Sequence, residues 1–170
     1  MFNNKVLIAD DDSIVRTLYS RILANIGLTI ILAKNGLEAL EKVKQCNPDL
    51  VILDIIMPEM NGYQVCRQIK SKPQTMNIPI VFCSNKSSKV DVYWGMKQGA
   101  DGYISKPVEK GELVTLMARF NLIKNASKEY SYQCLYKQGV VRILPIQDKY
   151  NFSKSIELSL TLLLGIAINT

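Results

Sequence analysis

Acidic side chains follow two of the apolar segments in this sequence. Asp10, Asp11 and Asp12 come directly after "KVLIA" (5–9), and Asp54 ends the segment "LVILD" (50–54). Neighbouring carboxylates repel one another unless a cation offsets their charge. Two acids from one segment and a third from a neighbouring segment could hold Mg²⁺, which prefers oxygen ligands and keeps several of its waters. Taken alone, the triplet could instead be an acidic helix start, which the helix dipole favours.

Phosphoryl chemistry needs further groups, and the sequence contains them. Next to a bound magnesium ion, a carboxylate oxygen of Asp54 could attack a phosphoryl group and form an acyl phosphate. Lys106 carries a point charge suited to a phosphoryl oxygen, and its bond to Pro107 predicts a specific turn, with a cis peptide as one option. Ser84 adds a hydroxyl donor. The sequence contains no histidine, which excludes mechanisms that use an imidazole base.

Five apolar segments alternate with segments of helical period, and together they must position these side chains. The apolar segments are rich in Val and Ile on both faces, which is typical of buried parallel strands. The predicted strands span residues 5–9, 28–33, 50–54, 78–83 and 102–105. The predicted helices span residues 14–26, 36–46, 62–71, 87–98 and 109–125.

Local signals support the helix predictions. Ser13 is a plausible N-cap for the first helix, Gly27 follows its end, and Gly99 ends the fourth helix. Apolar residues recur through the first helix at Ile14, Leu18, Ile22 and Ile26.

The strand and helix order predicts the α/β class, a (βα)5 open parallel sheet covered by helices on both faces. In such sheets the ligand site lies at the carboxyl ends of the strands, where the strand order reverses. Asp10, Asp54, Ser84 and Lys106 stand at or near four of these ends. We therefore expect these four residues to converge at one edge of the sheet.

Composition narrows the class of protein. The 170 residues are 48% hydrophobic, which indicates one compact domain with an additional segment. The net charge of +6 is spread along the chain, so it gives no strong nucleic-acid signal. The four cysteines form no C-x-x-C pair, which together with the absence of histidine argues against zinc. The apolar stretch at the N-terminus is too short for a signal peptide, and we expect a cytoplasmic protein.

The last part of the chain does not continue the pattern. We place one domain at residues 1–125 and an extension of unknown role at 126–170, in which "GVVRILPI" and "SIELSLTLLLGIAI" are typical of further β-strands. The second segment is too short and too polar for a membrane helix, which needs about 20 apolar residues. Two interpretations stay open for the extension: it pairs strands in a homodimer, or it is a remnant of a longer protein.

Four motifs resemble the receiver domain of two-component response regulators, the CheY-like family with a flavodoxin-like (βα)5 fold. The motifs, which fall within about residues 4–122, are "IADDDS", "VILDIIMPEMNGYQV", "IPIVFCSNKS" and "GADGYISKPVEKGEL". The resemblance implies that Asp54 is the phosphorylation site. It also implies that Mg²⁺ is bound directly by Asp11, Asp54 and the backbone carbonyl of Ile56, and through a water by Asp10.

The same resemblance assigns the switch residues. Lys106 would pair with a phosphoryl oxygen, Ser84 would bond another on activation, and Tyr103 would turn inward as the Ser84 loop moves. Asp12 matches no ligand position and is expected at the start of the first helix. Asn85 stands where the family commonly has a small residue, which puts access to the phosphoryl group in doubt.

The lifetime of the acyl phosphate is also a prediction from this resemblance. Ile56 and Lys86 occupy positions that influence this lifetime in the family. The apolar side chain of Ile56 cannot orient an attacking water, so we hypothesise slow self-hydrolysis.

The resemblance implies a signalling protein rather than an enzyme. A sensor histidine kinase or phosphotransfer protein would be the donor, and a downstream protein would bind the surface formed by the fourth helix, fifth strand and fifth helix. Two alternatives remain: a receiver-like interaction module that works without phosphorylation, and a haloacid dehalogenase-like phosphatase with Asp10 as nucleophile. No membrane partner is expected.

Overall fold

The computed structural model describes residues 4–123 as a five-stranded parallel sheet with the strand order β2-β1-β3-β4-β5. The strands are β1 (Lys5–Ala9), β2 (Thr29–Ala33), β3 (Leu50–Leu53), β4 (Ile80–Ser84) and β5 (Gly102–Ser105). The helices are α1 (Ser13–Ala24), α2 (Gly36–Cys46), α3 (Gly62–Lys70), α4 (Lys89–Lys97) and α5 (Lys110–Arg119). The predicted doubly wound (βα)5 fold, which is flavodoxin-like, is confirmed.

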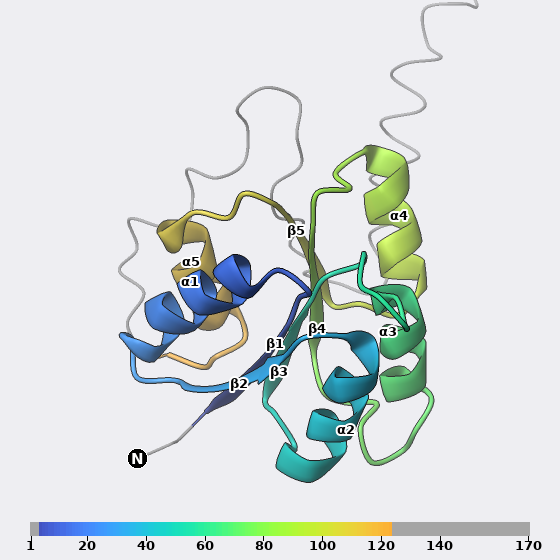
Figure 1. The fold of residues 1–170 in the computed structure, drawn as a ribbon, viewed down its shortest axis with the longest axis horizontal. Coiled ribbons are helices and arrows are strands. Elements are labelled where there is room, and N and C mark those ends of the chain that lie inside the picture. Colours follow the sequence, from blue (N-terminus) through green and yellow to red (C-terminus); the bar gives the residue numbers. More distant parts are fainter. Residues whose placement is uncertain (1–3, 124–170) are drawn as a thin grey trace, which may run out of the picture.

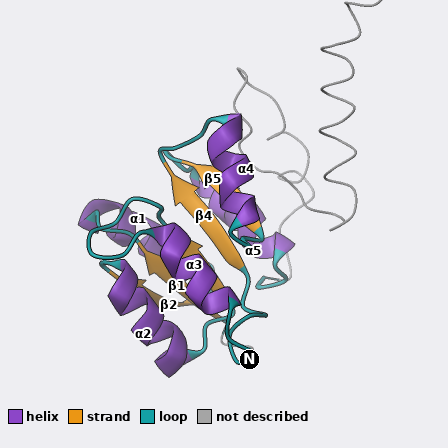
Figure 2. Ribbon diagram, turned by 90° about the vertical axis from the view of Figure 1, so that its right-hand side faces the viewer, coloured by secondary structure: helices purple, strands orange, loops and turns teal. Residues whose placement is uncertain are grey.

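Helices cover both faces of the sheet. Helices α1 and α5 lie on one face, and α2, α3 and α4 lie on the other (Figure 1). In the view turned by 90°, α2, α3 and α4 lie in front of the strands (Figure 2). Every residue of β3 and β4 is buried, as expected for central strands that are covered on both faces. The sheet thus provides a rigid base for the residues at its carboxyl edge.

Helix α1 differs from the sequence prediction in its cap and in its buried face. The N-cap is Asp12 rather than Ser13, and its side chain accepts a hydrogen bond from the backbone N–H of Ile14. Ile14 and Leu18 are 75% and 50% exposed. The face toward the sheet is instead formed by residues spaced about one helical turn apart: Val15, Tyr19, Ile22, Leu23 and Ile26. The predicted stripe was therefore correct only for its last two members.

Two other boundaries moved for local reasons. Strand β4 begins at Ile80 rather than at residue 78, because Pro79 has no N–H to donate to a neighbouring strand. Helix α5 ends at Arg119, well before the predicted residue 125, and Asn121 has a left-handed backbone with a φ of 58°. Asp54 lies one residue beyond the end of β3.

The predictions for the extension at 126–170 lie outside the described residues. Among the helices between residues 4 and 123, none is both long and apolar enough to cross a membrane.

Candidate functional site

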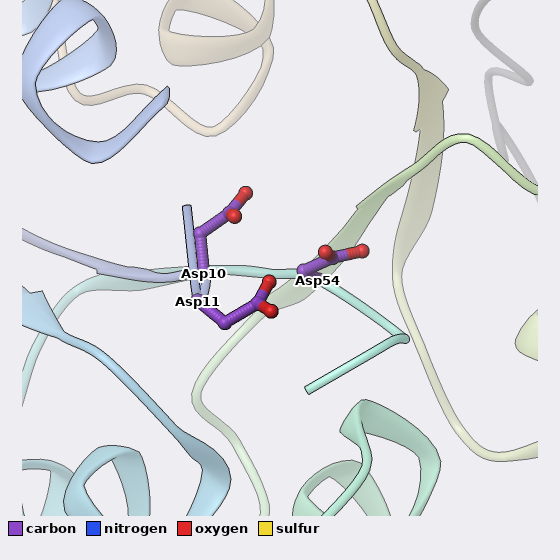
Figure 3. Close-up of side chains that lie close together, drawn as sticks. All are labelled: Asp10, Asp11 and Asp54. Carbon is purple, nitrogen blue, oxygen red and sulfur yellow. The ribbon is translucent and has the colours of Figure 1, made fainter. Parts of the chain in front are cut away.

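The acidic residues meet where the neighbouring strands β1 and β3 end. Ala9 of β1 pairs with Leu53 of β3, so the residues that follow them, Asp10 and Asp54, emerge side by side from the sheet. Carboxylate oxygens of Asp10, Asp11 and Asp54 lie within 4.8 Å of one another. Figure 3 shows these three side chains together at the carboxyl ends of β1 and β3. The predicted convergence of Asp10 and Asp54, at the ends of β1 and β3, is thus present.

Backbone hydrogen bonds fix the two buried acids. The N–H of Asp10 donates to the Ala33 carbonyl at 3.2 Å, and the N–H of Asp54 donates to the Ala9 carbonyl at 2.8 Å. A carboxylate oxygen of Asp54 accepts from the Ile55 N–H at 2.7 Å. Asp10 and Asp54 are only 2% and 6% exposed, whereas the neighbouring Asp11 is exposed. The site therefore has two rigid buried carboxylates and one that faces solvent.

Lys106 brings a cation between the two buried acids. Its Nζ lies 2.6 Å from Oδ2 of Asp10 and 3.0 Å from Oδ2 of Asp54. The Lys106–Pro107 peptide is cis, the option that the sequence left open, and the N–H of Lys106 donates to the Ser84 carbonyl at 3.0 Å. The loop after β5 is thereby joined to the end of β4.

Burial and pairing act in opposite directions on these groups. Burial raises the pKa of Asp10, and the hydrogen bond from Lys106 opposes that rise only in part. Burial alone would lower the pKa of Lys106, but its hydrogen bonds to Asp10 and Asp54 outweigh burial, so this pKa is raised. Lys106 therefore stays protonated at neutral pH.

The donor set fits a hard divalent cation. With all three acids ionised, three carboxylates face one ammonium group, which leaves a formal charge of −2. Oxygen ligands and an excess of negative charge are what Mg²⁺ requires.

Ser84 and Tyr103 both contact the loop between β4 and α4. Ser84 is fully buried, and its Oγ accepts from the Lys86 N–H at 3.4 Å. Tyr103 is 1% exposed and donates its hydroxyl hydrogen to the Lys86 carbonyl. Its ring packs inward against Phe82, with a centroid distance of 6.1 Å. The structure thus has Tyr103 in the inward orientation.

An open cavity of about 500 Å³ joins these groups. Asp10, Asp11, Asp54, Ser84 and Lys106 line it, together with Ile56 and Asn85, so all four predicted strand ends converge. Tyr103 is not among the lining residues. Ile56 is 56% exposed, and the predicted role of its carbonyl as a ligand stays a prediction.

The sequence analysis missed part of the cavity wall. Val15, Tyr19 and Val108 also line the cavity, and Tyr19 is only 3% exposed. The helical period could have placed Tyr19 on the buried face of α1, but its contact with the end of the sheet depends on how α1 packs.

Comparison with known proteins gives the family. The model of the response regulator receiver domain matches residues 6–118, which is most of the chain. The chain belongs to the response regulator receiver family. The receiver domain contains every residue of the site described above, since all of them lie within the matched range.

The receiver domain has relatives of known sequence and structure. The chain is similar to the alkaline phosphatase synthesis transcriptional regulatory protein PhoP of Bacillus subtilis, with 33% identity over 166 residues, 94% of this chain and 68% of PhoP. It is 37% identical to the DNA-binding response regulator MtrA of Mycobacterium tuberculosis over 110 residues, 65% of this chain and 47% of MtrA. The chain thus spans about half the length of MtrA.

A solved structure supports the fold. The chemotaxis response regulator CheY4 of Vibrio cholerae superimposes with a TM-score of 0.66 at 29% sequence identity, covering 69% of this chain and 98% of that protein.

Proposed function

We propose that this receiver domain accepts a phosphoryl group on Asp54 in a magnesium-dependent reaction and signals to a partner protein through the resulting change of shape. The observation that carries the proposal is the position of Asp54, a buried carboxylate that contacts Lys106 at 3.0 Å and lines an open cavity.

The reaction would run through Oδ2 of Asp54, the carboxylate oxygen that Lys106 contacts. One oxygen is held by the Ile55 N–H, and the other contacts Lys106 and faces the acidic cluster. That oxygen would attack phosphorus and form a P–O bond while the bond from phosphorus to a histidine nitrogen of the donor breaks. The electron pair leaves with the donor imidazole, which takes up a proton from solvent, and the product is an acyl phosphate.

Residues of this chain would hold the metal and the product. Asp11 and Asp54, with the Ile56 carbonyl, would bind Mg²⁺ directly, and Asp10 would bind it through a water. When bound, magnesium supplies positive charge that offsets the charge of the transferring phosphoryl group. Lys106 would pair with a phosphoryl oxygen, since its ammonium lies beside the attacking carboxylate.

The signal would be read at a surface on the other side of the Ser84 loop. Ser84 would donate a hydrogen bond to the phosphoryl group, and Tyr103 would be held inward by the repositioned loop. Helix α4, strand β5 and helix α5 would then present a changed surface to a downstream protein. The donor would be a sensor histidine kinase or a phosphotransfer protein, because this sequence contains no histidine of its own.

A phosphatase that uses Asp10 as its nucleophile is less well supported. Asp10 and Asp54 make similar contacts, each with one carboxylate oxygen on a backbone N–H and the other on Lys106, so these contacts do not favour one acid over the other. Asp54 is favoured by the match of residues 6–118 to the response regulator receiver domain.

Transcription control is a second candidate for the output. Two relatives are described as transcriptional or DNA-binding regulators, and the alignment with PhoP covers 94% of this chain, so it reaches beyond the receiver domain. The sequence alone gave no strong nucleic-acid signal, and a gel-shift assay with the phosphorylated full chain would decide between a protein and a DNA target.

Intact-protein mass spectrometry after incubation with acetyl phosphate tests the phosphoacceptor role. With MgCl₂ present, we expect the native chain and Asp10→Asn each to gain the mass of one phosphoryl group, and Asp54→Asn to gain none. If no chain gains mass, a module that works without phosphorylation becomes the better account; if Asp54→Asn gains mass and Asp10→Asn does not, the phosphatase account does.

A further inference from the structure

The loop between β3 and α3, residues 55–61, packs against the start of α2. The side-chain amide of Asn35, the N-cap residue of α2, donates to Oε1 of Glu59 at 2.8 Å. A Cβ on the next residue, Gly36, would lie 2.2 Å from the carbonyl oxygen of Met60, so the two backbones approach closely. Two independent contacts therefore join the start of α2 to the middle of this loop.

The side chain of Asn35 uses both of its polar atoms. Its oxygen accepts from the Glu38 N–H at 2.8 Å, which caps α2, and its amide group donates to Glu59. Asn35 is 9% exposed, whereas Glu59 is exposed. A helix cap needs only the oxygen, which an aspartate would supply equally well. The amide group of Asn35 is therefore explained by Glu59 and not by the cap.

Glu59 has a backbone conformation that depends on its contacts. Its φ is 65°, in the left-handed region that residues with a Cβ rarely adopt. Such a conformation costs free energy and persists where the surrounding structure holds it. The hydrogen bond from Asn35 holds the Glu59 side chain, and the close approach of Gly36 holds the following residue. The middle of the loop is thus fixed from α2.

The beginning and the end of the same loop meet beside the site. The Gly62 N–H donates to the Ile55 carbonyl at 2.9 Å, and a Cβ on Gly62 would lie 2.1 Å from the carbonyl oxygen of Asp54. Ile56 lines the cavity and lies between this contact and Glu59. The direction of the Ile56 carbonyl therefore depends on how the loop is held at both places.

We infer that Asn35 is a positioning residue for the magnesium site, and that through Glu59 it holds the 55–61 loop so that the Ile56 carbonyl faces the ion. This inference rests on the proposed function, in which that carbonyl is a ligand. Asn35 is not among the residues that line the cavity, so it acts through the loop. Removing a group that orients a metal ligand lowers metal affinity by about 10–100-fold.

Asn35→Asp separates the two roles of this side chain. A carboxylate caps a helix as well as an amide does, but it cannot donate a hydrogen bond to Glu59. We expect the Kd for Mg²⁺, measured by calorimetry, to rise roughly tenfold. The Tm in EDTA should change by less than about 4 °C, because the cap is kept.

A second substitution should restore the contact. Glu59→Gln keeps an oxygen that accepts from Asn35, so alone it should leave the Kd for Mg²⁺ within about twofold of the native value. Combined with Asn35→Asp, it exchanges donor and acceptor, since the new amide donates to the new carboxylate. This double variant has the native net charge, and its Kd should return to within about threefold of the native value.

Gln45→Glu is the matched control for charge. Gln45 lies near the opposite end of α2, and its amide donates to Glu41 at 2.9 Å. The substitution replaces the same kind of bond by the same kind of repulsion, away from the 55–61 loop. It should leave the Kd for Mg²⁺ within about twofold of the native value.

Hydrogen exchange gives a readout that needs no metal. In EDTA, the backbone amides of residues 55–61 should exchange faster in Asn35→Asp than in the native chain, because the loop is held less firmly. They should exchange at the native rate in the double variant. Peptide mass spectrometry measures both.

The outcomes separate the two proposals. A native chain that does not bind Mg²⁺ would overturn the magnesium dependence in the proposed function. With a native chain that binds Mg²⁺, the positioning role is overturned by an unchanged Kd or unchanged loop exchange in Asn35→Asp, by an equal rise of the Kd in Gln45→Glu, or by a double variant that stays as weak as Asn35→Asp. An Asn35→Asp chain that no longer folds would show that Asn35 supports the fold itself, which also overturns it.

Discussion

Replacing Lys106 with methionine tests the charge balance of the site. The ammonium is the cation that contacts both Asp10 and Asp54, at 2.6 and 3.0 Å, and the Lys106 side chain is only 9% exposed. At an effective dielectric constant of about 20, each contact supplies about 6 kcal/mol of gross attraction, most of which desolvation cancels. Lys106→Met keeps the length of the side chain and removes the charge.

The net effect is smaller than the gross attraction but still large. Removing one partner of a buried ion pair costs about 3–5 kcal/mol, because the remaining charges stay buried and uncompensated. The cavity is open to water, so we expect the lower end of this range, which corresponds to a fall in Tm of about 10 °C in EDTA. Excess MgCl₂ should raise the Tm of Lys106→Met more than that of the native chain, because the metal no longer competes with the ammonium for the same carboxylates.

The assay is thermal unfolding followed by circular dichroism in EDTA and in excess MgCl₂. Lys89→Met is the matched control, since Lys89 is exposed on α4 and its loss should change stability by less than about 0.5 kcal/mol. If Lys106→Met is as stable as the control in EDTA, or if magnesium stabilises it less than the native chain, the ammonium does not balance the acidic cluster as we argue.

Three further predictions follow from particular contacts. The hydrogen bond from Lys42 lowers the pKa of Glu38 below its ordinary 4.5, so the ionised Glu38 stabilises the fold at neutral pH and this stabilisation is lost as the pH falls. Glu38→Gln should therefore reduce the loss of stability on the acid side, measured as the free energy of unfolding in urea, by less than about 1 kcal/mol after solvent screening. A Cβ on Gly95 would lie 3.0 Å from the Tyr103 ring and 3.2 Å from the Phe82 ring. In urea unfolding, Gly95→Ala should therefore not give the native chain the usual gain of about 0.5–1 kcal/mol, and in a Tyr103→Ala background it should recover part of that gain. Ile56→Asn, which can orient a water at the cavity, should shorten the acyl-phosphate lifetime roughly tenfold in a phosphate-release assay, and an unchanged lifetime would refute our hypothesis about Ile56.

The fold could be predicted because the strongest signal in the sequence is the runs of apolar residues that form buried strands. The central strands are apolar on both faces, a pattern that does not depend on the details of packing. Helix α1 is a different case, because Ile14 and Leu18 lie one position away from Val15 and Tyr19, and either set fits a helical stripe. The pattern of apolar residues alone could not decide which set faces the sheet.

The site was predictable to the extent that strand ends determine it. Asp10, Asp54, Ser84 and Lys106 converge because parallel strands end at one edge, and no packing detail is needed for that prediction. The different exposure of the adjacent Asp10 and Asp11 depends on the backbone turn after β1. Tyr19 contacts Cys83 and packs in one core cluster with Val108, residues far apart in sequence, and only the packing of α1 against the sheet brings them together.

Chemical trapping of the acyl phosphate tests the central claim most directly. The native chain would be treated with acetyl phosphate and MgCl₂, then with borohydride, which reduces an aspartyl phosphate to homoserine, and the position of homoserine would be read by peptide sequencing in a mass spectrometer. The account predicts homoserine at position 54 alone. Homoserine at position 10, or none at any aspartate of a chain that is folded and binds magnesium, would contradict it.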